Sequence, residues 1–158
     1  MQRLLQTKGK ILGVDFGDKR TGLAVSDSTR FLASGIGQIS VGGMQRTAAR
    51  IVEIIKEQNV KGGVVVGLPV NMNGSIGPRA EHAKKFASIL EEMLNASTET
   101  SGMPIVMVDE RMSTMVAARY LNETDTRGQK RKGVIDTLSA QIILQDALDT
   151  LKNMSKNQ

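Results

Sequence analysis

ILGVDFGDKRTGLAVSD, residues Ile11 to Asp27, is the stretch around which the chain is organised. Successive side chains of a strand alternate between its two faces, so Asp15 shares its face with Gly13 and Gly17. A glycine inside a strand often marks a place where a ligand or another backbone comes close. Asp15 is therefore a candidate ligand-binding carboxylate. The same residue could instead end the strand and cap the turn FGDKRTG, a use for which aspartate is well suited.

Composition places the chain among ordinary globular proteins. Its 158 residues fit one domain, and 40% of them are hydrophobic and 23% charged. Cysteine is absent, which excludes disulfide frameworks and thiolate sites and is compatible with a reducing cytoplasm. The N-terminus lacks the apolar stretch of a secretory signal, and the longest mostly apolar run, Gly62–Val70, is far shorter than a membrane span. We expect a cytoplasmic protein with no membrane partner.

The chain is basic. Lys and Arg number 21 against 16 Asp and Glu, for a net charge of +5 and an isoelectric point near 9.7. This balance suits a polyanionic partner such as nucleic acid. Aromatic residues make up only 3% of the chain, whereas a protein that reads single strands by base stacking would want several exposed aromatics. We therefore expect contacts to the backbone and shape of a nucleic acid to dominate its recognition.

Hydrophobic periodicity predicts an α/β fold. Three hairpin-connected strands come first, with Gly22 easing the exit from the first turn. The later run GVVVGL is typical of a parallel strand that is covered on both faces. The expected strands start at residue 11 and cover 21–26, 31–41, 63–68 and 105–108, and the expected helices cover 44–59, 78–94, about 113–123 and 134–151. Residues 1–10 are expected to form an N-terminal extension, 11–152 a single domain and 153–158 a frayed tail.

The order of these elements, β-β-β-α-β-α-β-α-α, indicates where a site should form. Right-handed crossovers place the last two strands parallel to the first, with helices on both faces of the sheet. In parallel sheets, sites form at the carboxyl ends of the strands. Asp15, the loop PVNMNGSIGP at 69–78 and Glu110 all fall at such ends.

Two further acids are candidates for this site. Asp109 and Glu110 follow the apolar run IVMV, and strand parity lets only one of them face a given side without choosing between them. Asp136 shares a predicted helix face with small residues, including Ser139 and Ala140, that suit close approach to a sheet. A buried carboxylate must find a partner or a cation. Each acid also has an alternative that involves no ligand. Asp109 and Glu110 could cap the next helix, and Asp136 could interact with the dipole of its own helix.

Three such carboxylates could converge on one edge of the sheet. Two of them about 4 Å apart would repel by roughly 4 kcal/mol at an effective dielectric of about 20, so the cluster would need cations. With no cysteine and one histidine, the available ligands are hard oxygens, which favour Mg²⁺ or Mn²⁺ over zinc. Two such ions would activate water and stabilise the leaving oxygen of a phosphodiester. His82, midway along a predicted helix, is expected to be an ordinary helix residue.

Cations gather near the predicted site. Four of them fall in six consecutive positions just before Asp136: Arg127, Lys130, Arg131 and Lys132. They belong to an expected loop over 126–133, and they could contact phosphates or simply be solvated. Arg79 and the N–H groups behind Pro78 form a second candidate anion site.

The chain carries four motifs in order: ILGVDFGDKRTGLAVSD, VVVGLPVNMNGSIGPRA, VDERMST and KRKGVIDTLSAQIIL. Together they resemble the YqgF or RuvX family of pre-16S rRNA nucleases, also called Holliday-junction-resolvase-like proteins, from Ile11 to about Leu151. The resemblance implies an RNase H-like fold, with a mixed five-stranded sheet whose second strand is antiparallel. It also implies catalytic and metal-binding acids at Asp15, Glu110 and Asp136, which chooses Glu110 over its neighbour.

The implied activity is metal-dependent processing of the 5′ end of precursor 16S rRNA, with Mg²⁺ or Mn²⁺ as cofactor. The residues expected to contact nucleic acid are Lys19, Arg20, Arg79, Arg111, Arg127, Lys130, Arg131 and Lys132. Asn73 stands where the family often has an acid, so no contact made by such an acid is assigned to it. We expect a monomer or a weak homodimer.

Three other functions compete with rRNA processing. The first is cleavage of four-way DNA junctions by the same acids, which would favour a stable dimer because symmetric resolution needs two active sites. The second is a non-catalytic rRNA-binding assembly factor that merely inherited the acids. The third is an actin-like or sugar-kinase ATPase, which also uses an Asp-x-Gly turn. That class binds nucleotide between two such domains, whereas 158 residues supply one.

Overall fold

The computed structural model describes residues 1–71, 73–110 and 128–157, with the backbone alone for 128–134. Five strands form one sheet in the order β3-β2-β1-β4-β5. The strands are β1 (Ile11–Asp15), β2 (Thr21–Ser26), β3 (Ala33–Ile39), β4 (Gly63–Leu68) and β5 (Ile105–Asp109). The β1–β2 and β2–β3 pairs are antiparallel, and the β1–β4 and β4–β5 pairs are parallel. The predicted mixed sheet is confirmed.

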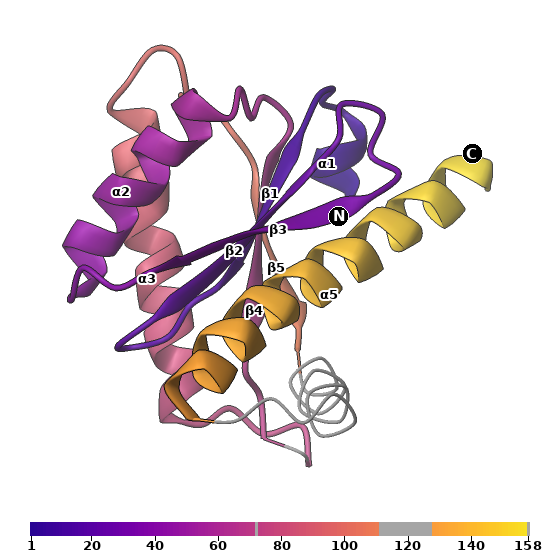
Figure 1. The fold of residues 1–158 in the computed structure, drawn as a ribbon. Coiled ribbons are helices and arrows are strands. Elements are labelled where there is room, and N and C mark those ends of the chain that lie inside the picture. The colour runs from indigo at the N-terminus through magenta and orange to yellow at the C-terminus, as the bar shows by residue number, and fades with distance from the viewer. Residues whose placement is uncertain (72, 111–127, 158) are drawn as a thin grey trace.

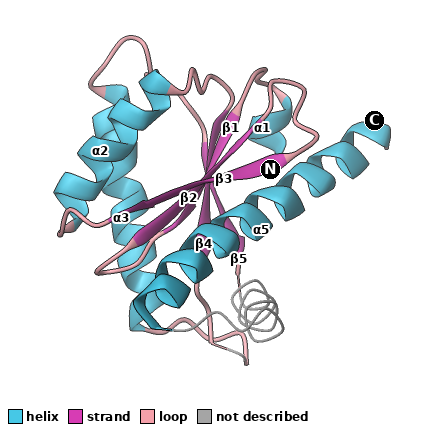
Figure 2. Ribbon diagram, viewed as in Figure 1, coloured by secondary structure: helices cyan, strands magenta, loops and turns pink. Residues whose placement is uncertain are grey.

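Helices cover both faces of this sheet. Figure 1 and Figure 2 show α2 (Met44–Glu57) and α3 (Pro78–Asn95) on one face, while α5 (Gly128–Lys156) crosses the other. Each face has its own core, and alternation along β1 divides its side chains between them. Leu12 and Val14 are buried with α2 and α3, whereas Ile11 is buried with α5. By the same alternation, Asp15 belongs to the α5 face.

Glycines bring α5 unusually close to the sheet. A Cβ atom on Gly13 would lie 2.7 Å from the Cβ of Leu144, and one on Gly22 would lie 1.9 Å from the carbonyl oxygen of Asp136. The prediction that Gly22 eases a turn was therefore wrong. Its hydrogen side chain instead admits the backbone of α5, which no larger residue would allow.

Two predicted boundaries also differ from the structure. β3 begins at Ala33, and the two residues before it lie outside the strand and are exposed to solvent. The last helix begins at Gly128, so Lys130, Arg131 and Lys132 lie in its first turns and not in a loop. Lys, Arg and Gln are good helix formers, and the single Gly133 within the run costs only about 1 kcal/mol. The helix expected over 113–123 lies outside the described residues.

The N-terminal residues form a short helix, α1 (Gln2–Leu5), that packs on the α5 side. Leu4 is fully buried there. Arg30 joins this segment to the sheet because its guanidinium donates to the carbonyl oxygens of Gly9 and Leu4, at 2.8 and 2.7 Å. At the other end of the chain, α5 continues to Lys156. None of the helices within the described ranges is long and apolar enough to cross a membrane.

Candidate active site

The parallel strands β1, β4 and β5 all end at one edge of the sheet. Asp15 is the last residue of β1, and Glu110 directly follows β5. Between them lies β4, whose Val66 pairs with Val14 and whose Gly67 pairs with Val108. The register therefore sets Gly67 between the two acids, as the prediction of a site at the carboxyl ends requires.

Glu110 turns back over β4 toward Asp15. Only 4% of its surface is exposed, and a Cβ on Gly67 would lie 2.3 Å from its Oε2 atom. The absent side chain of Gly67 thus leaves the space that the Glu110 carboxylate fills. Glu110 lies two residues after Val108 and four after Val106, so it points to the same side of β5 as these two residues, which pack in the α5 core. Glu110, and not its neighbour Asp109, therefore shares the face of Asp15.

The two carboxyl groups interact directly, and their contact favours a proton on Asp15, since it raises the pKa of Asp15 and lowers that of Glu110. Burial raises the pKa of Asp15 well above its usual range, and the charge of Glu110 raises it further. Burial also raises the pKa of Glu110, although the hydrogen bond from Asp15 and the charge of Arg79 oppose this. Two acids are thus held where their negative charge is poorly solvated.

Asp136 approaches the pair from α5. Its backbone lies against Gly22, which is the partner of Asp15 across the β1–β2 ladder. Its carboxylate accepts a hydrogen bond from Nε of Arg20 at 2.8 Å, and the side chains of both are partly exposed. Burial raises the pKa of Asp136, and Arg20 and then Arg79 counteract that effect. Asp136 in turn helps to raise the pKa of Asp15, so the third acid lies within electrostatic reach of the pair.

Arginines surround these three acids. Arg79, exposed in the first turn of α3, acts electrostatically on all three carboxylates. Arg20 and the exposed Lys19 lie in the turn after β1. Three of the cations expected to contact nucleic acid are therefore gathered at the edge that carries the acids. Arg111 and Arg127 lie outside the described residues.

The family model described as RuvX, Holliday junction resolvase, matches residues 9–150. The chain belongs to the RuvX family. One relative, named "Putative pre-16S rRNA nuclease", from Caldanaerobacter subterraneus subsp. tengcongensis, is 46% identical over 145 residues, which cover 91% of this chain and 99% of the relative. A protein of the same name from Pelotomaculum thermopropionicum is 43% identical over 142 residues, 89% of this chain and 87% of the relative.

The RuvX chain shares its fold with solved resolvases. RuvC from T. thermophilus in complex with a Holliday junction substrate matches with a TM-score of 0.53 and 15% identity, over 90% of this chain and 94% of that one. Fowlpox virus resolvase in complex with Holliday junction DNA matches with a TM-score of 0.52 and 12% identity, over 90% and 98%. At these identities the likeness concerns the fold alone, and it confirms the predicted RNase H-like class.

The donor chemistry of this RuvX site suits a hard divalent cation. Asp15, Glu110 and Asp136 offer only carboxylate oxygens, and the poorly solvated charge of the first two is what a cation would offset. In the part of the chain that the structure describes, no group of three or more His, Cys, Asp or Glu side chains is arranged to hold a metal ion. In this structure the carboxylate of Asp136 instead accepts the hydrogen bond from Arg20.

Some residues near the RuvX site were not predicted to matter. Asp18, in the turn after β1, lies 3.3 Å from Nδ1 of His82 on α3, so the turn and the helix are joined beside the acids. No sequence signal marks this contact, because neither residue is part of a periodic pattern. Asn73 accepts hydrogen bonds from the backbone and hydroxyl of Ser75, at 3.0 and 2.6 Å. The side-chain oxygen of Asn73 thus organises the loop before α3.

Proposed function

We propose that this RuvX protein is a cytoplasmic, metal-dependent nuclease that processes the 5′ end of precursor 16S rRNA in small-subunit maturation. The observation that carries the proposal is the convergence of Asp15 and Glu110 over Gly67, with Asp136 beside them. Relatives that bear the name of a pre-16S rRNA nuclease match about nine tenths of the chain, which supports rRNA as the substrate. The net charge of +5 suits that polyanion.

Asp15, Glu110 and Asp136 would hold Mg²⁺ or Mn²⁺. Such ions supply an activated water and stabilise the leaving oxygen of an in-line displacement. Asp15 and Glu110 already lie together and would form two of the three ligands. Asp136 would be the third, and Arg20, which now donates to its carboxylate, would be able to donate hydrogen bonds to a phosphate of the substrate.

The cations around the acids would position the nucleic acid backbone. Arg79 lies at the start of α3, where the helix dipole adds to its positive charge. Lys19 and Arg20, in the turn after β1, would contact the same strand. The same role is proposed for Arg111 of the third motif, for Arg127, and for three cations of the fourth motif, Lys130, Arg131 and Lys132. Backbone contacts of this kind bind strongly without reading sequence.

Cleavage of four-way DNA junctions is the second candidate, and the description of the matching family favours it. Symmetric resolution would need two active sites, so it predicts a stable dimer, whereas rRNA trimming is compatible with the monomer or weak homodimer that we propose. A non-catalytic assembly factor would bind rRNA without cutting it.

Cleavage assays on matched substrates would separate these functions. The purified protein is incubated with RNA that carries a precursor or a mature 16S 5′ end and with a four-way DNA junction, in Mg²⁺, Mn²⁺ or chelator. We expect cleavage of precursor RNA that the chelator abolishes. Glu110→Gln should lower the rate about 100-fold or more, as expected when a metal ligand worth several kcal/mol is lost, whereas the matched control Asp109→Asn should not. Cleavage that survives the chelator would refute the proposal.

A further inference from the structure

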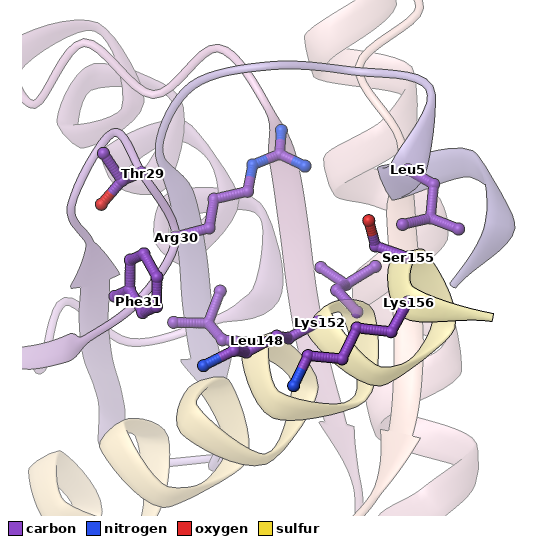
Figure 3. A pocket seen from close by; sticks show the side chains of 9 residues that line it. Leu5, Thr29, Arg30, Phe31, Leu148, Lys152, Ser155 and Lys156 are labelled. Atoms are coloured by element: carbon purple, nitrogen blue, oxygen red, sulfur yellow. The ribbon is translucent and has the colours of Figure 1, made fainter. Parts of the chain in front are cut away.

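A hollow of about 320 Å³ opens at the end of α5 that is remote from the acids (Figure 3). It lies between the turn that precedes β3 and the last turns of α5. The residues that line it are Leu5, Thr29, Arg30, Phe31, Leu148, Leu151, Lys152, Ser155 and Lys156. Its floor is apolar and its rim is basic, and none of the nine lining residues is an acid. No residue that lines this hollow takes part in the site described above.

The turn beside the hollow is held rigidly in a shape that exposes Phe31. Asp27 accepts hydrogen bonds from the backbone N–H groups of Phe31 and Leu32, at 2.8 and 3.0 Å. Gln145 of α5 donates to the carbonyl oxygen of Phe31 at 2.9 Å and accepts from the N–H of Ala33 at 2.9 Å. With this backbone, Phe31 and Leu32 are 58% and 68% exposed. Several hydrogen bonds thus hold two large apolar side chains in contact with water, although the hydrophobic effect favours their burial.

Phe31 is an exposed aromatic ring in contact with a cation. The ammonium of Lys152 lies over one face of the Phe31 ring, 4.8 Å from its centre. Figure 3 shows Lys152 and Lys156 extending side by side from α5, and both are exposed. Of the three phenylalanines only Phe31 is exposed, because Phe16 and Phe86 stack on each other in the core. The fold therefore places its one exposed phenylalanine next to a pair of lysines.

We propose that this hollow binds one base of a single-stranded nucleic acid, stacked on Phe31, with the adjoining phosphates on Lys152 and Lys156. An aromatic face accepts any base, and flanking cations track the backbone, which is the usual composition of single-strand sites. An apolar protein partner would not explain the lysine pair or the lack of acids. The proposal rests on the proposed function, because the strand is taken to belong to the same substrate.

The distance to the acids suits one continuous strand. Lys152 follows Asp136 by sixteen residues on α5, so at about 1.5 Å per residue the two lie roughly 24 Å apart along the helix axis. If the nucleotides were spaced by about 3.4 Å, as in one strand of a stacked duplex, this distance would correspond to roughly seven nucleotides. A strand that follows α5 could therefore occupy both places at once, and the hollow would measure substrate length beyond the cleavage site.

Binding measurements on the full-length Asp15→Asn protein, without metal, test this proposal independently of cleavage. The probe is a fluorescent single-stranded RNA of about twelve nucleotides, longer than the roughly seven required, with 2-aminopurine to report stacking. Phe31→Leu keeps an apolar side chain but removes the ring, and Lys152→Gln and Lys156→Gln each remove one charge. Lys56→Gln, on α2 and the opposite face of the sheet, is the matched charge control. Thermal melting verifies that each variant is folded.

We expect Phe31→Leu to weaken binding by about 5- to 150-fold, which corresponds to roughly 1–3 kcal/mol, and to abolish 2-aminopurine quenching. Each lysine variant at the hollow should reduce the slope of log affinity against log salt by about 0.7, and Lys56→Gln should not. Wild-type affinity in the Phe31 and lysine variants would overturn the proposal. An equal change of the salt slope in Lys56→Gln would also overturn it. A third contrary result would be a protein dimer that Phe31→Leu weakens while the affinity for RNA stays unchanged.

The two proposals fail separately. Unchanged RNA affinity in the hollow variants, with normal cleavage by the protein that retains Asp15, overturns the hollow alone. The expected loss of affinity, with no cleavage of any substrate, overturns the proposed function alone.

Discussion

Replacing Gly22 by alanine tests how closely α5 must approach the sheet. The added Cβ would lie 1.9 Å from the carbonyl oxygen of Asp136, whereas an ordinary contact is at least 3.4 Å. Because that oxygen belongs to a helix backbone, it cannot rotate away. The helix must therefore recede by the difference between 3.4 and 1.9 Å, about 1.5 Å.

This displacement should affect stability and activity to different degrees. Overpacking of this kind costs about 1–3 kcal/mol. In a domain of this size each kcal/mol lowers Tm by roughly 2–4 °C, so a fall of about 2–12 °C is expected. Most molecules stay folded at 25 °C, because native stability is about 5–15 kcal/mol. Asp136 moves with its own carbonyl, however, and a shift of about 1 Å at a catalytic group can cost roughly 100-fold in rate.

Thermal melting and cleavage of precursor RNA, measured on the same preparation, would check both numbers. Gly13→Ala is the matched control, because its Cβ would also press on α5, 2.7 Å from the Cβ of Leu144, two turns beyond Asp136. It should lower Tm while sparing more of the activity. Two results would refute the reasoning: an unchanged Tm in Gly22→Ala, or an equal loss of rate in both variants.

Three further predictions concern charges. Burial and Glu110 raise the pKa of Asp15 above its ordinary value of 3.8. Without metal, the folded protein therefore keeps a proton on Asp15 at pH values where the unfolded chain has lost it, and the free energy of unfolding should fall as the pH rises from about 4. Asp15→Asn should remove that slope and raise stability at pH 7 in urea unfolding, and a variant less stable than wild type would contradict this. Arg20→Gln should destabilise by about 1 kcal/mol, since its bond to Asp136 is only partly exposed, whereas Arg50→Gln, on an exposed pair, should change the stability less in the same assay. The pKa of Asp27 is lowered to about 2 by hydrogen bonds from Thr29 and the turn backbone, so Asp27→Ala should speed amide exchange in the 27–32 turn, and unchanged protection would refute its role.

Local patterns were enough to predict most of the elements. The run GVVVGL predicted β4 with its observed bounds, and alternation around Asp15 predicted which of its neighbours share a face. Both patterns depend on residues adjacent in sequence, where side-chain periodicity reports the backbone directly. The start of α5 was predicted six residues too late, because the run of cations there has no apolar periodicity.

Contacts between distant segments required the tertiary structure. Strand parity left Asp109 and Glu110 equivalent until the position of α5 showed which face of β5 carries the acids, although the family resemblance had already favoured Glu110. The partner of Asp136, Arg20, lies 116 positions away, and Gly22 admits a helix backbone from the far end of the chain. The sequence by itself predicted the strands in chain order, their directions in the sheet and the acids at their ends. Only the tertiary structure decided how those acids meet, because close approach and charge pairing depend on three-dimensional distance, which no local pattern encodes.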